Sequence, residues 1–106
     1  MKRYDICWAI LGPARGAEMA KKRPVVIVSL DIMNEHLQTI TVCPLTSQLH
    51  SRWRSRLQVR CVGQPAEIAV DQIRTLSKSR LGAKIGLLSP VDAASLRRLI
   101  TEMYGE

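Results

Sequence analysis

Pro24-Val25-Val26-Ile27-Val28-Ser29-Leu30 decides the fold class of this chain, because its consecutive β-branched residues favour a buried strand. Pro24 fits the first position of that strand, where its missing N–H interrupts no ladder. Residues 5–11 form an earlier apolar, β-prone run, which a Gly-Pro pair ends at 12–13. Between the two runs we expect a polar loop with glycines and four basic residues: Arg15, Lys21, Lys22 and Arg23.

Alternating apolar and polar side chains predict further strands downstream. Residues 38–43 alternate, and Pro44 is expected to end that strand. Residues 53–61 alternate strictly, which predicts a half-buried strand with a basic outer face that includes Arg54 and Arg56. A turn at 63–65 follows, and the inward pattern then resumes as far as Asp71.

The C-terminal segment predicts a helix with well-marked ends. Ser89 can cap it, Pro90 suits its first position, and Gly105 ends it. Apolar residues at 96, 99, 100 and 103 follow helical spacing. Before this helix, we expect an irregular segment at 31–36, a short helical or turn segment at 75–81, and a brief strand at 84–88.

These elements together indicate an α+β fold, a small antiparallel, partly open β-barrel with a C-terminal α-helix. The 106 residues leave room for a single domain spanning 1–106. No apolar run approaches the roughly 18 residues that a bilayer requires, and no signal peptide is recognisable, so we expect a cytoplasmic protein that binds no membrane. Cys7, Cys43 and Cys61 each lie in an apolar run without metal-ligand spacing, which favours buried, reduced thiols and no metal.

The charge of the chain favours a polyanionic partner. Sixteen Lys and Arg against nine Asp and Glu give a net charge of +7, which attracts nucleic acid or an acidic protein. Solubility alone is the alternative explanation. Because the chain has no Phe and few other aromatic residues, its core must be aliphatic, and the stacking platform of many RNA-binding sheets is largely missing.

Four short segments concentrate the residues that can carry chemistry: residues 12–18, Lys22-Arg23-Pro24-Val25-Val26, Cys43-Pro44-Leu45-Thr46-Ser47-Gln48 and Val70-Asp71-Gln72-Ile73-Arg74-Thr75. Each has an ordinary explanation when taken singly. Arg23 can be a solvated charge, and Thr46 can satisfy backbone groups of a turn. Asp71 and Arg74 can form a structural ion pair.

Taken in order, Gly-Pro-x-x-Gly-x-Glu, Arg-Pro-Val-Val-Ile-Val, Cys-Pro-x-Thr-Ser-Gln and Asp-Gln-x-Arg-Thr resemble the motifs of the MazF/PemK family of toxin endoribonucleases. The motifs span residues 4–76 and the terminal helix also fits, so the resemblance covers nearly the whole chain. It implies an SH3-like barrel of the CcdB/PemK type and a homodimer that clamps single-stranded RNA along its interface. It also implies an activity without cofactors, and an antitoxin whose acidic, disordered tail competes with RNA for the same groove.

Matched by motif, the resemblance places the family's catalytic arginine on Arg23, its catalytic threonine on Thr46 and its loop glutamate on Glu18. From the resemblance or from charge, RNA-binding residues are expected at eight further positions: Arg15, Lys22, Ser47, Gln48, Arg54, Asp71, Gln72 and Arg74. The chain departs from the family at Tyr4, where relatives usually have glycine, and at Met19, where they usually have glutamine. The second departure bears on substrate contacts of the loop more than on the chemistry.

The family's reaction is the metal-independent attack of a 2′-OH on the neighbouring phosphorus, which leaves a cyclic phosphate and a 5′-hydroxyl. Arg23 suits stabilisation of the phosphorane oxygens because its guanidinium is always charged and matches phosphate, and Thr46 can donate a further hydrogen bond. The proton acceptor stays open between Glu18 as leading candidate, Asp71 as the second and His50 as the third. Electrostatics without any side-chain base is the remaining alternative.

Three aromatic or imidazole positions and two other functions complete the alternatives. His36 and His50 lie in polar stretches and are interpreted as surface residues. Trp53 can stack on an RNA base, but its parity with Leu57 favours a place in the core. A CcdB-type gyrase poison is disfavoured because the chain ends without a Trp-Gly-Ile tail. A basic barrel that binds nucleic acid without cutting it leaves the four motifs unexplained.

Overall fold

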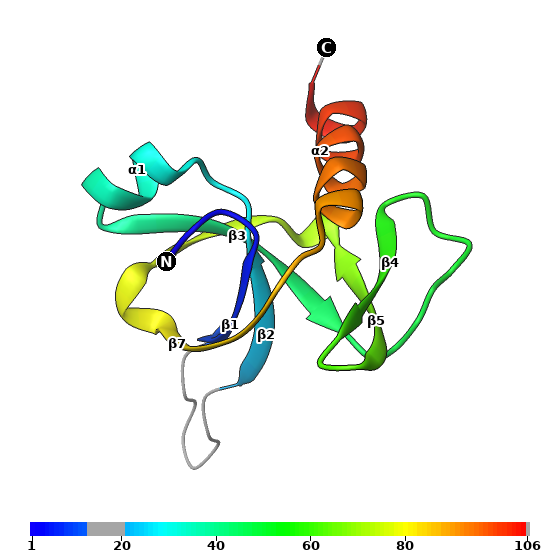
Figure 1. Cartoon of the computed structure of the whole chain (residues 1–106), viewed down its shortest axis with the longest axis horizontal. Coiled ribbons are helices and arrows are strands. Elements are labelled where there is room, and N and C mark those ends of the chain that lie inside the picture. The colour runs from blue at the N-terminus through cyan, green and yellow to red at the C-terminus, as the bar shows by residue number, and fades with distance from the viewer. Residues whose placement is uncertain (13–20, 106) are drawn as a thin grey trace.

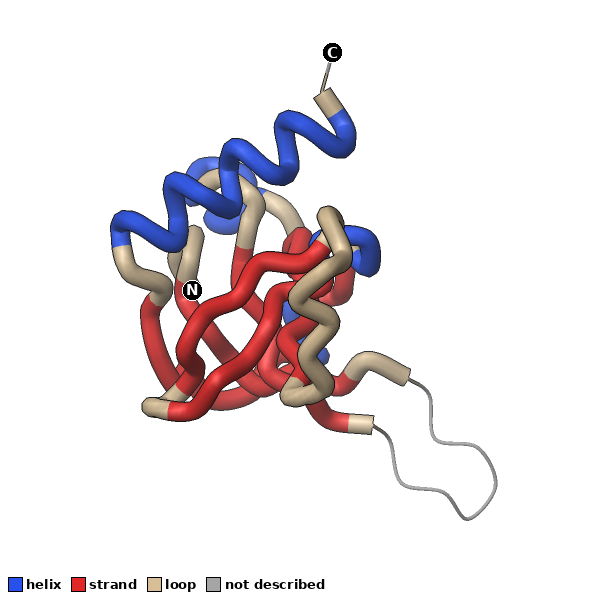
Figure 2. The backbone as a smooth tube through the Cα atoms, turned by 90° about the vertical axis from the view of Figure 1, so that its right-hand side faces the viewer, coloured by secondary structure: helices blue, strands red, loops and turns tan. Residues whose placement is uncertain are grey.

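The structure is a computed structural model that describes residues 1–12 and 21–105. Within these residues, seven strands form one curled antiparallel sheet, and a C-terminal helix lies across one end of it (Figures 1 and 2). The strands are β1 (Asp5–Ile10), β2 (Lys22–Ile27), β3 (Thr39–Thr46), β4 (Arg56–Cys61), β5 (Gln64–Ala69), β6 (Arg74–Ser77) and β7 (Leu81–Leu87). The helices are α1 (Asp31–His36) and α2 (Pro90–Tyr104), with 3₁₀ turns η1 (Val70–Gln72) and η2 (Lys78–Arg80). The expected fold class is confirmed.

Strand β3 organises the sheet because it pairs with three other strands. Along one edge it pairs with β2, and along the other it pairs first with β6 and then with β5. The expectation that Pro44 ends this strand is therefore wrong. Thr41 directs both its N–H and its C=O to the β2 side, so the nitrogen of Pro44, three residues on, faces the other edge. There β6 has ended and β5 begins, so the missing N–H breaks no ladder.

The hairpin of β4 and β5 differs from the expectation at its turn and at its outer face. Val62 and Gly63 have φ of 53° and 76°, and they form a two-residue turn one position earlier than expected. The strand begins at Arg56, so Trp53 and Arg54 precede it. The Arg56 side chain is only 5% exposed rather than solvated, because it pairs with the buried carboxylate of Glu67 and with Asp71.

Three segments between the strands also differ from the sequence-based expectations. Residues 31–36 form α1, which Ser29 and Asn34 anchor to the sheet: the Ser29 hydroxyl donates to Asn34 Oδ1, and Asn34 Nδ2 donates to the Ser29 carbonyl. Residues 74–77 form β6 instead of a helical or turn segment, because they pair with β3. Strand β7 begins at Leu81, three residues before the expected start.

Helix α2 forms as its sequence predicts. The Ser89 hydroxyl accepts a hydrogen bond of 3.1 Å from the Asp92 N–H, Pro90 is the first residue, and Gly105 follows the last turn. Ala93 and Leu96 are buried against a core that includes Val26, Leu45 and Ile68. In the described part of the chain, no helix is both long and apolar enough to cross a membrane.

The cysteines and Tyr4 each have a physical explanation in the fold. Cys7 and Cys43 are buried free thiols as expected, and burial raises the pKa of Cys43 to about 12, whereas Cys61 is only partly buried. Tyr4 has a φ of 72°, in the left-handed region that glycine adopts without strain. The resemblance leads us to expect glycine at this position, and glycine adopts a positive φ more easily than tyrosine does.

Candidate functional site

A cavity of about 380 Å³ opens beside the ends of β2, β3 and β4, and five of the eleven expected site residues line it. Arg23 and Thr46 line it together with Gln48, Gln72 and Arg74. Segments far apart in the sequence thus contribute to one wall, as the sheet order requires. The other lining residues are Leu11, Gly12, Lys21, Pro44, His50, Arg56 and Ala69.

Arg23 and Thr46 lie on the neighbouring strands β2 and β3 and line the same cavity. Val25 pairs with Pro44, and these two residues lie two positions along their strands from Arg23 and from Thr46. The Thr46 hydroxyl accepts a hydrogen bond of 3.1 Å from the Gln48 N–H, so its own proton stays available for donation into the cavity. Among the described residues, no carboxylate pairs with Arg23, so its charge can meet an anion.

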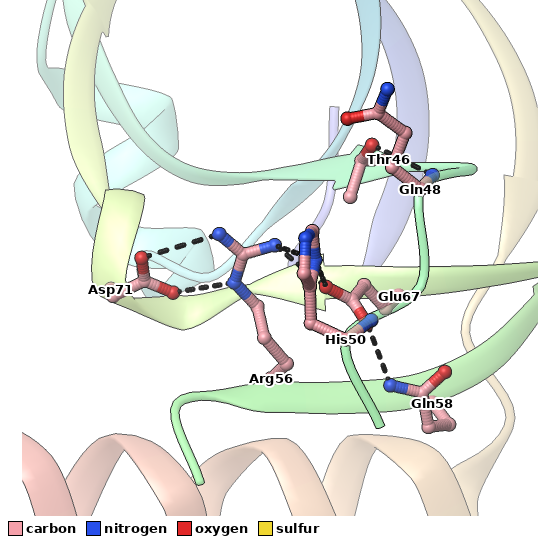
Figure 3. Close-up of polar contacts among 7 residues, drawn as sticks. All are labelled: Thr46, Gln48, His50, Arg56, Gln58, Glu67 and Asp71. Carbon is pink, nitrogen blue, oxygen red and sulfur yellow. Dashed lines mark hydrogen bonds and ion pairs between the residues drawn. The ribbon is translucent and has the colours of Figure 1, made fainter. Parts of the chain in front are cut away.

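Glu67 on β5 is a fully buried carboxylate that binds two residues of the cavity lining, His50 and Arg56 (Figure 3). It accepts hydrogen bonds from the His50 N–H at 2.5 Å, the His50 ring at 3.0 Å, Gln58 at 2.7 Å and Arg56 at 2.6 Å. Burial alone would raise the pKa of Glu67, but these bonds outweigh it and lower the pKa to about 2. Glu67 is therefore a charged group at neutral pH, and its charge fixes three neighbours.

Arg56 bridges Glu67 to Asp71. Its Nε donates to Asp71 at 2.8 Å while its Nη1 donates to Glu67, and Figure 3 shows the guanidinium between the two carboxylates. The bond to Asp71 raises the pKa of Arg56. Burial would raise the pKa of Asp71, but bonds from Arg56 and Ser55 lower it. Because both carboxylates neutralise Arg56, its role is to join β4, β5 and η1, and Asp71 pairs with Arg56 instead of Arg74.

His50 lines the cavity and Trp53 packs against His50, and neither position was expected from the sequence. The interpretation of His50 as a surface residue holds only in part, since its side chain is 33% exposed but also bonds to the buried Glu67. Trp53 is not in the core: it is 50% exposed, and its ring stacks on the His50 ring at a centroid distance of 3.9 Å. The Arg56 guanidinium lies 4.7 Å from the Trp53 ring centre, so the indole packs against the same cluster.

Arg74 makes a further bond at this cavity, and the remaining described residues that were expected at the site lie outside it. Ser47 lines a smaller cavity of about 240 Å³ that shares Arg23 and Thr46 with the first. Arg74 donates to the Leu11 carbonyl at 2.9 Å. Lys22 lines a different hollow beside Trp8. Arg54 lines neither, since its side chain is 92% exposed and pairs with Glu102 of α2. Arg15 and Glu18 lie outside the described residues, as does Met19.

Sequence reasoning missed Glu67 as a site residue and assigned Arg56 to a solvated face. The signal for both was the register of the β4–β5 hairpin, which places Gln58 opposite Glu67 and Arg56 two residues away on the same strand. A lone acid inside an apolar strand, with basic and amide side chains across from it, indicates a buried ion pair. Among residues 1–12 and 21–105, no three His, Cys, Asp or Glu side chains are grouped as a metal-ligand cluster.

Comparison with known proteins identifies similar chains. Residues 2–104 match the family model for the PemK-like, MazF-like toxin of type II toxin–antitoxin systems. The chain is 32% identical to Endoribonuclease MazF of Staphylococcus saprophyticus over 94 residues, which covers 84% of this chain and 78% of the relative. It resembles the Mycobacterium tuberculosis toxin MazF-mt6 with a TM-score of 0.79 at 25% identity, covering 94% of this chain and 95% of the other.

Two further structures share the fold at lower identity. One is an endoribonuclease in complex with its cognate antitoxin from a mycobacterial species, with a TM-score of 0.84 at 20% identity over 99% of this chain and 95% of the other. The other is a MazE–MazF complex from Deinococcus radiodurans, with a TM-score of 0.84 at 18% identity over 99% of this chain and 96% of the other.

Proposed function

We propose, from the premise that this chain belongs to the PemK/MazF family of type II toxins, that it is an endoribonuclease that cuts single-stranded RNA without a metal ion. In the proposed reaction a 2′-OH attacks the neighbouring phosphorus, and the products are a cyclic phosphate and a 5′-hydroxyl. One observation carries the proposal: Arg23 and Thr46 lie on adjacent strands and line the same two cavities.

The chemistry of Arg23 and Thr46 suits a phosphorane. The guanidinium stays charged at any physiological pH, and its planar fork can donate two hydrogen bonds to the non-bridging oxygens. The Thr46 hydroxyl, held by the Gln48 N–H, can donate a third. Donors fixed where charge develops are worth about 10²- to 10³-fold in rate each.

The two cavities support cleavage at a defined sequence. A phosphate placed between Arg23 and Thr46 has one flanking nucleotide beside the larger cavity and the other beside the smaller one. The smaller cavity has apolar walls that include Pro24 and Pro65, with Ser47 and Gln64 as polar groups that can read a base edge. Lys21 and Arg74 add positive charge along the larger one.

The positive charge of this cavity also indicates which partners the protein binds. We propose that a homodimer extends this surface into an RNA groove, and that an acidic antitoxin in the cytoplasm occupies the groove in place of RNA. Structures of family-fold relatives in complex with an antitoxin or with MazE support this part of the proposal. Simultaneous tight binding of RNA and antitoxin in a competition titration contradicts it.

The test uses purified protein, a long single-stranded RNA and EDTA, with mapping of the 5′ ends of the products. Arg23→Ala and Thr46→Ala are compared with wild type, and Arg98→Ala, on the far helix α2, serves as the matched control. Cuts at a recurring short sequence, lost in the first two variants and kept in the third, support the proposal. Wild-type protein that binds the RNA and never cuts it overturns the proposal.

A further inference from the structure

Glu67 and Trp53 both contact the His50 ring, and the reaction proposed above assigns no role to either contact. Its Nδ1 lies 3.0 Å from a Glu67 carboxylate oxygen, and the backbone N–H of His50 donates to the other oxygen of the same carboxylate. Trp53 stacks on the ring at 3.9 Å with an angle of 20° between the planes. The orientation of the imidazole is thus fixed by a buried charge and by an aromatic plane.

This arrangement also fixes which ring nitrogen carries the proton. Glu67 is ionised and can only accept, so the neutral ring carries its proton on Nδ1 and donates it to Glu67. The Nε2 atom then has a free lone pair, and no described residue donates a hydrogen bond to it. His50 lines the same cavity as Arg23 and Thr46, so the imidazole is at the proposed reaction site.

We propose that His50 is the general base of the cleavage reaction and that Glu67 is its positioning residue, an inference that rests on the proposed function. Nε2 removes the proton of the 2′-OH while the 2′-oxygen forms its bond to phosphorus. The bond from phosphorus to the 5′-oxygen breaks, and the 5′-oxygen leaves with the electron pair and takes a proton from water. The imidazolium, stabilised by Glu67, returns its extra proton to solvent.

The other candidate base among the described residues fits this role less well. Asp71 accepts two hydrogen bonds from Arg56, at 2.8 and 3.4 Å, and its lowered pKa makes it a weak proton acceptor. An imidazole, in contrast, changes its charge between about pH 5 and 8, where a base of RNA cleavage works best. Glu18, the leading candidate from sequence, lies outside the described residues.

Charged groups face His50 from several elements. Glu67 of β5 lies 3.0 Å from Nδ1, and Nη1 of Arg56 on β4 lies 3.5 Å from the same atom. Asp71 of η1 acts through its pair with Arg56. The remaining cationic groups that line the cavity are Lys21, Arg23 and Arg74. An imidazole acts as a base only in its neutral form, so the cleavage rate is expected to rise with pH between about 5 and 8.

The test measures the single-turnover cleavage rate of an RNA with one cut site between pH 5 and 8. In His50→Asn the amide can still donate to Glu67 but has no counterpart of Nε2. We expect a rate about 10²-fold or more below wild type, with RNA affinity within about threefold, and loss of the rise with pH. His36→Asn, on the exposed helix α1, is the matched control and should keep both rate and pH profile. His50→Gln is the second variant if His50→Asn loses its circular dichroism signal.

A second substrate separates a base from an acid. Replacing the 5′-oxygen of the scissile bond by sulfur gives a leaving group that needs no proton. The defect of His50→Asn persists on this RNA if His50 is the base, whereas rescue to the wild-type rate assigns it as the acid and overturns the proposal. Glu67→Gln should keep RNA affinity but lower the rate and move the pH profile.

The failure of this inference is distinguishable from failure of the proposed function. If wild type cuts RNA and His50→Asn cuts equally fast with the same pH profile, only the assignment of His50 is overturned. If wild type cuts no RNA, the proposed function itself fails.

Discussion

Replacing Glu67 by Gln should change how the stability of this protein depends on pH. The side chain is fully buried, and its hydrogen bonds hold its pKa at about 2 against an ordinary value of 4.5. At about 1.4 kcal/mol per pH unit, this depression corresponds to about 3 kcal/mol of free energy of unfolding at neutral pH. Glutamine has a similar shape but no charge to lose.

The sign follows from the two pKa values of Glu67. Between about pH 5.5 and 2 the unfolded chain binds a proton that the folded protein excludes, so acid favours unfolding. The contribution is complete above about pH 5.5, and about 2 of the 3 kcal/mol is gone at pH 3. The stability advantage of wild type over Glu67→Gln should therefore shrink by about 2 kcal/mol between pH 7 and pH 3.

Urea unfolding followed by circular dichroism, at one protein concentration, measures this difference. Glu102→Gln is the matched control, because that carboxylate is 62% exposed and its one ion pair among the described residues is with the exposed Arg54. It should leave the pH dependence of the free energy of unfolding unchanged. An advantage of wild type over Glu67→Gln that is the same at pH 7 and pH 3 refutes the assignment of Glu67 as a charged, buried group.

Three other substitutions test separate parts of the structure. Arg56→Lys should lower the free energy of unfolding by about 1–3 kcal/mol in urea titrations, because an ammonium cannot reach both Glu67 and Asp71 with a planar fork. Ser89→Ala should lower it by about 1 kcal/mol, measured in the same way, since the hydroxyl caps α2. Lys21→Ala should reduce the slope of log affinity for single-stranded RNA against log salt by about 0.7, the value for one phosphate contact, and an unchanged slope places Lys21 away from the RNA.

Local signals in the sequence predicted the elements whose stability is local. Helix α2 was predicted to its ends because Ser89, Pro90 and Gly105 act on the helix that contains them. The β-branched run at 24–30 predicted β2 because such side chains favour strands, but its bounds were wrong: β2 spans Lys22–Ile27, so Pro24 is its third residue and not its first. Segment α1 and strand β6 were missed, because α1 depends on the Ser29–Asn34 bonds and β6 on pairing with β3.

The site residues also divide into those that the sequence predicted and those that depend on contacts between distant segments. Arg23 and Thr46 were predicted from motifs, and the strand register then brings them together. The apolar–polar alternation of the strand wrongly assigned Arg56 to a solvated face. Alternation indicates which side chains share a face of the sheet, but it does not indicate whether solvent reaches that face. Trp53 was assigned to the core by parity, yet the strand starts only at residue 56, so parity does not extend to it.

The charges of the site have two separate roles, and this division explains why a basic cavity contains a buried acid. Arg56 is committed to Glu67 and Asp71, so its charge fixes the walls of the cavity and does not attract RNA. Arg23, which no described carboxylate pairs with, keeps its charge for a phosphate. If Glu67 only balanced Arg56, it would need neither the backbone nor the ring of His50. Because Glu67 binds both, the same charge that stabilises the hairpin also orients the imidazole. In Glu67→Gln, the free energy of unfolding and the cleavage rate should therefore both fall. In His50→Asn, the cleavage rate should fall without a matching loss of stability.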